Sequence, residues 1–199
     1  MRKFSNYLLS ASFTLVMLFA SSASAISYFD IGFGVGPAWA TLNNYNIGGS
    51  GNDVALDFGM KIGGRPIDLG ADLYIVGELS GATSTCFYHF MDNGSHPYAD
   101  IYFFMIGPGA IYYPVQSIQL GLSVGYSSIA YQDGWGKIGT KKGYAYDISV
   151  GLDLDNLLGL KGYGPVNLMG LKYYVSTDGR YVKSSTISLF LKYIYRGRD

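Results

Sequence analysis

Two histidines, His89 and His96, lie in a polar segment together with Asp92, Ser84 and Ser95. Serine, histidine and aspartate make up a nucleophilic triad, and two histidines with a carboxylate can bind a metal ion. A triad needs a fixed geometry that proximity in one loop does not supply, and the spacing of these histidines matches no closed metal site. We therefore predict no catalytic residues, no metal site and no cofactor, and hence no enzyme.

Charged residues elsewhere fall at alternate positions inside apolar stretches. Between Val54 and Ile62, apolar residues alternate with Asp57, Gly59 and Lys61. Because side chains alternate between the two faces of a strand, one face is continuously apolar and the other carries the charges. This pattern predicts a strand that needs an apolar environment on one side only.

Eight stretches share this alternation and together run from residue 28 almost to the C-terminus. They cover 28–39, 53–62, 67–79, 99–113, 118–131, 144–154, 166–176 and 184–195. Most of them reach the about 9–11 residues that a membrane-crossing strand needs, and no helix is predicted that could cover their apolar faces. Closing the strands into a ring, with the apolar face towards lipid, satisfies the backbone hydrogen bonds. We therefore predict an all-β fold, an eight-stranded antiparallel up-and-down transmembrane β-barrel.

The first 25 residues have the features of a cleaved signal peptide. Arg2 and Lys3 precede an apolar stretch that is shorter than the about 20 residues of a membrane span, and a pattern of small residues ends at Ala25. Cleavage there leaves residues 26–199 as one outer-membrane barrel domain, with 12 basic and 14 acidic residues. This balance gives no electrostatic case for a nucleic-acid partner. We expect export through the general secretory route to the bacterial outer membrane.

The predicted connections alternate in length. The links 63–66 and 114–117 are short, whereas 40–52, 80–98 and 132–143 are much longer. Short periplasmic turns that alternate with longer external loops are typical of outer-membrane barrels, so we expect both ends of the mature chain in the periplasm. Cys86, the only cysteine, falls in the 80–98 loop, where we expect an unreactive thiol.

Tyrosine and tryptophan gather near the predicted strand ends, where their rings suit the lipid headgroup region. The periplasmic set is Tyr28, Tyr112, Tyr113, Tyr193 and Tyr195, and the external set is Trp39, Tyr98, Tyr131, Trp135, Tyr144 and Tyr181. Over residues 28–195 the pattern resembles the small eight-stranded outer-membrane barrels, which include the OmpA transmembrane domain, OmpX and OmpW-like proteins. Members usually end in an aromatic residue that the assembly machinery reads, whereas four residues follow Tyr195 here. The resemblance implies outer-membrane lipid, periplasmic chaperones and the barrel assembly machinery as partners of a monomer.

An eight-stranded ring leaves an interior that side chains just fill. Charges kept away from lipid must pair with one another or with water, so we expect a salt-bridged plug rather than an open pore. The lumen charge network that we predict comprises Asp30, Asp57, Lys61, Asp72, Glu78, Asp147 and Asp153, with Lys172 and Lys192 as further inward candidates.

A structural or surface-interaction (adhesion-like) role is the function that these features favour. The 80–98 loop carries apolar groups that would otherwise face water, and exposed aromatic patches often mark partner surfaces. The candidate contact residues, for a host or matrix ligand, are Phe87, Tyr88, His89, Phe90 and His96. They can equally fold over the barrel mouth. Lysines 137, 141 and 142 in the next loop could meet lipopolysaccharide phosphates or acidic glycans, or remain solvated.

The alternative function is a narrow channel or gate for small or hydrophobic solutes, as the OmpW-like resemblance implies. The stretch 99–113 is apolar on both faces, so its register is open. If Ile101 and Phe103 face lipid, Tyr102 and Phe104 line an apolar inner wall, with Ile106 beside them. Packing against a bulky neighbour in the lumen explains the same residues.

Overall fold

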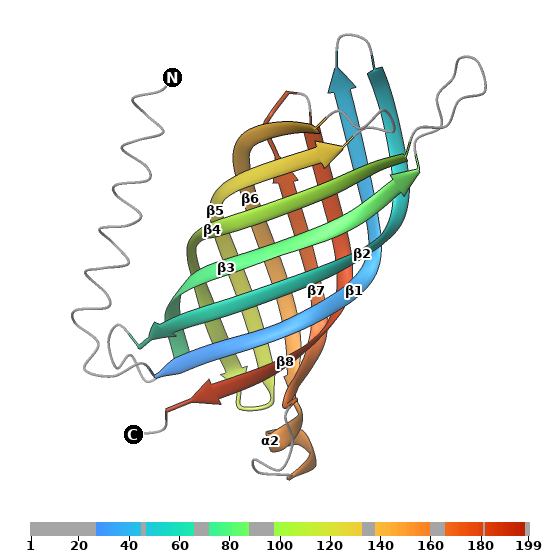
Figure 1. Ribbon diagram of the computed structural model, residues 1–199. Coiled ribbons are helices and arrows are strands. Elements are labelled where there is room, and N and C mark those ends of the chain that lie inside the picture. Colours follow the sequence, from blue (N-terminus) through green and yellow to red (C-terminus); the bar gives the residue numbers. More distant parts are fainter. Residues whose placement is uncertain are drawn as a thin grey trace, which may run out of the picture.

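Eight antiparallel strands form one closed barrel in the computed structural model, which describes residues 27–44, 47–65, 72–87, 98–132, 138–159, 166–180 and 182–197 (Figure 1). Each strand pairs with the next, and β8 pairs with β1. The strands are β1 (Tyr28–Asn44), β2 (Ile47–Gly64), β3 (Asp72–Phe87), β4 (Tyr98–Val115), β5 (Ile118–Gln132), β6 (Ile138–Asp153), β7 (Leu168–Thr177) and β8 (Val182–Arg196). The predicted fold class is confirmed. The predicted signal peptide, residues 1–25, lies outside the described residues.

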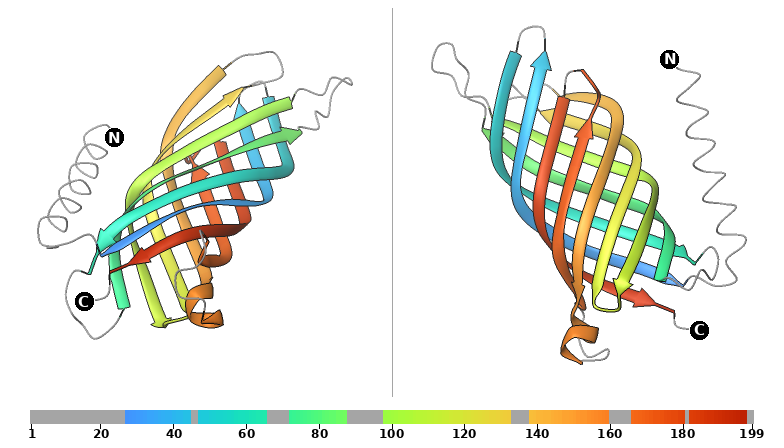
Figure 2. Two further views of the ribbon diagram at one scale, coloured as in Figure 1. Left: turned by 60° about the horizontal axis from the view of Figure 1, so that its bottom comes forward. Right: turned by 180° about the vertical axis from the view of Figure 1, so that it is seen from behind.

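The barrel has two ends that differ in construction (Figure 2). At the terminal end, Tyr28 pairs with both Gly63 and Arg196, and the short helix α2 (Leu154–Leu158) follows β6. The Asp153 carboxylate caps this helix by accepting a hydrogen bond from the Asn156 backbone N–H. At the opposite end lie the strand ends that join β1 to β2, β3 to β4, β5 to β6 and β7 to β8; we call it the hairpin end. No helix among the described residues is long and apolar enough to cross a membrane.

The strands at the hairpin end continue well beyond the predicted limits. The backbone ladder extends to the pair Asn44–Ile47 between β1 and β2, and to Phe87–Tyr98 between β3 and β4. The predictions of long loops at 40–52, 80–98 and 132–143 are therefore wrong for residues 40–44, 47–52, 80–87, 98, 132 and 138–143, which are strand. Backbone pairing does not require an alternation of apolar and polar residues, so the sequence pattern did not reveal these extensions. Cys86 accordingly lies on β3 and not in a loop.

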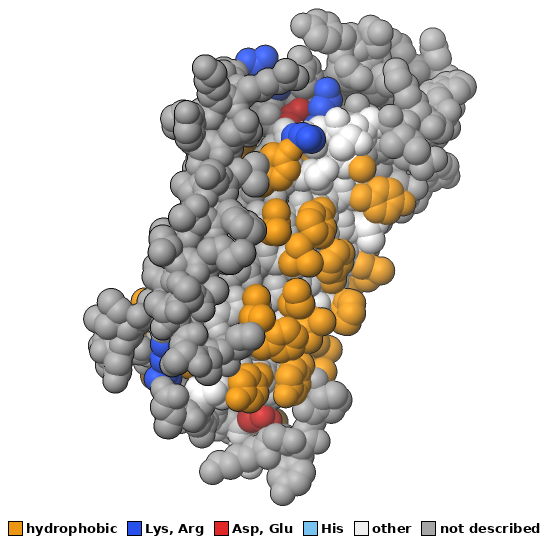
Figure 3. All heavy atoms as spheres, turned by 60° about the vertical axis from the view of Figure 1, so that its left-hand side comes forward, with side chains coloured by type: hydrophobic (Ala, Val, Ile, Leu, Met, Phe, Trp, Pro, Cys, Tyr) orange, Lys and Arg blue, Asp and Glu red, His pale blue; other side chains and the backbone are white. Residues whose placement is uncertain are grey.

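Side chains alternate strictly between the two faces of the wall. On β2, Leu56 and Phe58 point outward and are 60% and 44% exposed, whereas Asp57 and Lys61 point inward and are buried. The outward positions of the other strands are likewise apolar over the middle of the barrel, as Figure 3 shows for one side. Charged side chains lie above and below this apolar band.

Two of the eight ladders are interrupted within the strands, and a Gly-Pro pair marks each of these gaps. The β4–β5 ladder also shifts its register between Tyr112 and Val115, close to the turn. Pairing of β1 with β8 skips Gly36 and Pro37, and pairing of β4 with β5 skips Gly107 and Pro108. Proline has no N–H to donate to a ladder. A Cβ atom on either glycine would lie 2.0–2.1 Å from a backbone oxygen of the neighbouring strand, so the close approach requires glycine.

Candidate functional site in the barrel lumen

One lysine ties four strands together in the middle of the lumen. The Lys61 ammonium on β2 lies 2.8 Å from Glu78 Oε2 on β3 and 3.4 Å from Asp147 Oδ1 on β6. It also donates a hydrogen bond of 3.0 Å to Ser123 Oγ on β5. All four residues are fully or almost fully buried. The ammonium therefore faces two carboxylates and donates hydrogen bonds to Ser123 and Asp147.

Two more buried ion pairs lie beside this lysine. Lys172 Nζ on β7 is 2.7 Å from Asp57 Oδ1 on β2, which links strands on different sides of the ring. Lys192 Nζ on β8 is 3.3 Å from Asp30 Oδ1 on β1, and the Tyr28 hydroxyl donates a 2.7 Å hydrogen bond to the other oxygen of Asp30. Ion pairs thus connect six of the eight strands through the interior.

Glycines on the inner face provide the space that these charged side chains occupy. A Cβ atom on Gly34 would lie 2.6 Å from Asp57 Oδ2, and one on Gly32 would lie 2.4 Å from Lys192 Cγ. Both distances are far below a van der Waals contact. The inward glycines that the sequence places on β1 therefore make room for the ion pairs and do not open a water path there.

The terminal end of the lumen is closed by aromatic and polar side chains. Gln119 Nε2 donates hydrogen bonds of 2.8 Å to the hydroxyls of Tyr28 and Tyr113. The Arg196 guanidinium lies 4.1 Å above the Tyr113 ring and contacts Asp153 Oδ2 at 2.5 Å. We call this set, together with Tyr74, which packs against both tyrosine rings, the lumen floor.

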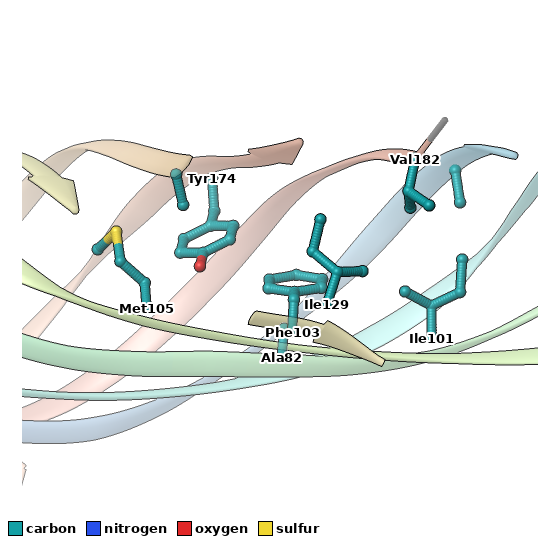
Figure 4. Close-up of a cluster of buried hydrophobic side chains, with 9 residues drawn as sticks. Ala82, Ile101, Phe103, Met105, Ile129, Tyr174 and Val182 are labelled. Carbon is teal, nitrogen blue, oxygen red and sulfur yellow. The ribbon is translucent and has the colours of Figure 1, made fainter. Parts of the chain in front are cut away.

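An apolar cluster fills the lumen towards the hairpin end (Figure 4). The Phe103 and Tyr174 rings are stacked, with their centroids 4.7 Å apart. The other members are Ala40, Ala82, Ile101, Met105, Ile129, Ala145 and Val182. The register considered for the gate is therefore reversed on β4. Ile101, Phe103 and Met105 face inward, whereas Tyr102, Phe104 and Ile106 face outward and are 41–53% exposed.

The charged layer carries more carboxylates than ammonium groups. Four buried acids, Asp30, Asp57, Glu78 and Asp147, surround the three buried lysines. Several buried oxygens, among them Asp57 Oδ2, Asp147 Oδ2 and the hydroxyls of Ser80, Ser149 and Tyr174, have no protein hydrogen-bond partner. A layer of this composition suits ordered water, which typically makes about three hydrogen bonds to such groups.

The predicted lumen residues fall into three places. Asp30, Asp57, Lys61, Glu78 and Asp147 share the buried layer, and Asp153 belongs to the lumen floor. Asp72 instead pairs with Arg65 near the terminal end, where each side chain is 32% exposed. Sequence reasoning missed the partners Gln119, Ser123, Tyr28 and Arg196. Gln119 and Ser123 occupy alternate, inward-facing positions of β5, and this alternation could have identified them as lumen residues.

The candidate contact residues are described only in part. Phe87 is the last residue of β3 and pairs with Tyr98, whereas Tyr88, His89, Phe90 and His96 lie outside the described residues. Within the described part of the chain, no three His, Cys, Asp or Glu side chains are placed to hold a metal ion.

Comparison with known proteins identifies the fold. No family model matches the chain, and no curated protein matches its sequence. The crystal structure of Ail, the attachment invasion locus protein of Yersinia pestis, aligns with a TM-score of 0.51 at 13% identity, covering 86% of this chain and all of Ail. Neisserial surface protein A (NspA) aligns with a TM-score of 0.47 at 18% identity, over 82% and 95% of the two chains. The predicted likeness to small eight-stranded outer-membrane barrels is confirmed for the fold.

Proposed function

We propose that this chain is an integral protein of the bacterial outer membrane with a sealed lumen, and that it acts structurally and through its exposed hairpin end. The observation that supports this proposal is the inverted distribution of side chains. Apolar residues cover the outside of the barrel, and ion pairs fill the inside.

The outer surface is suited to lipid and not to water. Phe33, Leu56 and Leu122 are 73%, 60% and 52% exposed in the middle of their strands. Contiguous apolar patches of this extent are rare on soluble monomers. Outward tyrosines mark both borders of the apolar band, with Tyr195 near the terminal end and Tyr144 towards the hairpin end. This arrangement is typical of barrels with aromatic girdles at the two interfaces.

Three successive layers support a closed lumen. A solute that enters at the terminal end meets the lumen floor, then the ion-paired layer, and then the stacked rings of Phe103 and Tyr174. The test is conductance in planar bilayers with protein whose insertion has been checked by protease resistance in vesicles. We expect no steady openings, and steady ion-conducting openings would overturn the sealed lumen.

The surface-interaction part of the proposal concerns the β3–β4 hairpin. Its strands remain paired up to Phe87 and Tyr98, which is three residues beyond the last pair of β3 with β2 at Ser84 and two residues beyond the pair of β4 with β5 at Asp100. Residues 88–97, which we call the contact segment, connect the two strands at this end. The name of Ail, attachment invasion locus protein, refers to attachment and invasion. The shared fold alone makes the same class of role a hypothesis for this chain.

A segment replacement tests this role. Replacing residues 88–97 with Asn-Gly keeps the Phe87–Tyr98 pair, and Asn-Gly is a favoured hairpin turn. We expect binding to host cells or matrix proteins to be lost while the thermal stability is retained. The matched control replaces residues 133–137, between Gln132 and Ile138, with the same dipeptide. Unchanged binding after the first replacement, or equal loss after the control, would contradict the role of the contact segment.

The alternative, a gate for small or hydrophobic solutes, has weaker support. An apolar inner wall exists near the hairpin end, as a gate requires, but Phe103, Tyr174 and Met105 occupy it themselves. Export through the secretory route with cleavage after Ala25, insertion by the barrel assembly machinery, a monomeric state and the lack of enzymatic activity all remain predictions. Amino-terminal sequencing of the mature protein tests the cleavage site.

A further inference from the structure

The helix α2 has one polar and one apolar face. Residues three and four apart share a face of a helix, so Leu154, Leu157 and Leu158 lie together. Asp155 and Asn156 lie on the other side. Leu157 and Leu158 are 54% and 60% exposed. They are thus as exposed as the outward residues of the barrel wall, although they lie beyond the strands (Figure 1).

Hydrogen bonds hold the polar face of α2 against the barrel. Asn156 Nδ2 donates to the Gln116 carbonyl oxygen in the β4–β5 turn at 3.3 Å. Asp155 Oδ2 accepts from Asn167 Nδ2 at 3.4 Å, and the same amide donates to the Ile194 carbonyl oxygen on β8 at 2.9 Å. The leucine face cannot turn towards the barrel without breaking these contacts, so α2 presents it to the surroundings.

The outward row of β6 leads into this leucine face without a break. Ile148, Val150 and Leu152 occupy alternate outward positions and are 39–50% exposed. Leu154, the first residue of α2, is the next residue in this alternation. Asp153, which separates Leu152 from Leu154 in the chain, points inward to the lumen floor. The apolar outer surface of β6 therefore extends onto α2 with no charged side chain between them.

The height of the wall leaves room for α2 in the membrane. On β6, Tyr144 borders the apolar band towards the hairpin end, and Leu152, eight residues further on, is the last outward residue of the strand. A strand tilted by about 40° that rises about 3.3 Å per residue covers about 20 Å over this distance, whereas the apolar band of an outer-membrane barrel is about 25 Å tall. Outward tyrosines border the terminal end at Tyr112 on β4 and Tyr195 on β8, but the outward residues of β5 and β6 near that end are aliphatic. The helix α2 therefore lies where the lowest part of the band is expected.

We propose that Leu157 and Leu158 insert into the periplasmic leaflet of the membrane, where α2 completes the lipid-facing surface beyond β5 and β6. This inference rests on the proposed outer-membrane location. A helical turn with an apolar face and a polar face is suited to the boundary between acyl chains and headgroups, because each face meets a medium of its own polarity. Phospholipid is favoured over a protein partner because the leucine face continues the lipid-facing wall of β6.

The experiment measures whether the two leucine positions contact lipid or water. A nitroxide label is attached to single cysteines, introduced as Leu157→Cys or Leu158→Cys together with Cys86→Ala, in barrel reconstituted in phosphatidylcholine nanodiscs. Oxygen concentrates among acyl chains and a nickel chelate stays in water, so the ratio of their collision rates with the label reports its depth. We expect both labels to have a several-fold higher oxygen-to-nickel ratio than a label at Gln116→Cys. This is the matched control, because the Gln116 side chain is exposed in the neighbouring turn, and a label at Phe58→Cys gives the lipid reference.

The outcomes separate this inference from the proposed function. If the label at either leucine position has the same ratio as the label at Gln116, while the label at Phe58 contacts lipid, the inference is wrong and the lipid-facing wall stands. The leucine face is then exposed to water and open to a periplasmic protein. If the label at Phe58 also collides mainly with the nickel chelate, the proposed outer-membrane role fails and the inference fails with it.

Discussion

Replacing Lys61 with Met tests whether the buried ion pairs hold the barrel together. At an effective dielectric constant of about 20, charges 2.8 Å and 3.4 Å apart attract by about 6 and about 5 kcal/mol. The cost of burying the three charged groups offsets most of this attraction. Removing the lysine leaves Glu78 and Asp147 as uncompensated neighbours in the same layer. We therefore expect Lys61→Met to lower the free energy of unfolding by about 3–5 kcal/mol.

The assay is urea unfolding of the barrel from lipid vesicles, followed by tryptophan fluorescence. Asp72→Asn is the matched control, because it breaks an ion pair with Arg65 that is about one-third exposed, and it should cost at most about 1 kcal/mol. A triple variant in which Lys61→Met is combined with Glu78→Gln and Asp147→Asn should recover much of the loss, since no unpaired charge remains. If Lys61→Met costs no more than Asp72→Asn, the reasoning about the buried layer is refuted.

Two further predictions concern space in the lumen and polarity on the wall. Gly34→Ala should lower the free energy of unfolding by about 1–3 kcal/mol because its methyl group would overlap the Asp57 carboxylate. In Gly59→Ala the methyl group meets nothing closer than 3.6 Å, so this substitution should be neutral or slightly stabilising. Equal effects of the two substitutions would contradict the assigned packing. Phe58→Arg, near the middle of the apolar band, should lower the free energy of unfolding from vesicles by about 2–4 kcal/mol. Thr140→Arg, at the hairpin end, should lower it by about 0–1 kcal/mol. A similar loss at both depths would argue against a lipid-facing band.

The sequence was sufficient to assign the two faces of a strand where the face towards lipid is apolar and the face towards the lumen is polar. On β2 the contrast between Phe58 and Asp57 is enough to assign the faces. On β4 both faces are apolar, because Phe103 packs inside the lumen while Phe104 lies on the outer wall, so alternation carries no information there. Tertiary packing decides that register.

Strand ends and ion-pair partners were beyond the reach of a sequence pattern for physical reasons. The extensions of β1 to Asn44 and of β3 to Phe87 are held by backbone hydrogen bonds, which do not constrain side-chain type. Lys61 and Glu78 are direct cross-strand neighbours, but Lys172 and Asp57 are brought together only when the ring closes. Pairing across the lumen depends on the barrel diameter and on the inward glycines.

The two Gly-Pro interruptions have a mechanical consequence. They fall on the β1–β8 and β4–β5 ladders, which lie across from each other in a ring of eight, and the other six ladders are continuous. Each interruption removes two residues from a ladder that is paired on both sides of it, so each of the two seams between β1–β4 and β5–β8 lacks backbone hydrogen bonds part-way along its length. The ion pairs of Lys61 with Asp147 and of Lys172 with Asp57 join the same two halves through the interior, so side chains in the lumen reinforce a wall whose backbone ladder is interrupted at both seams.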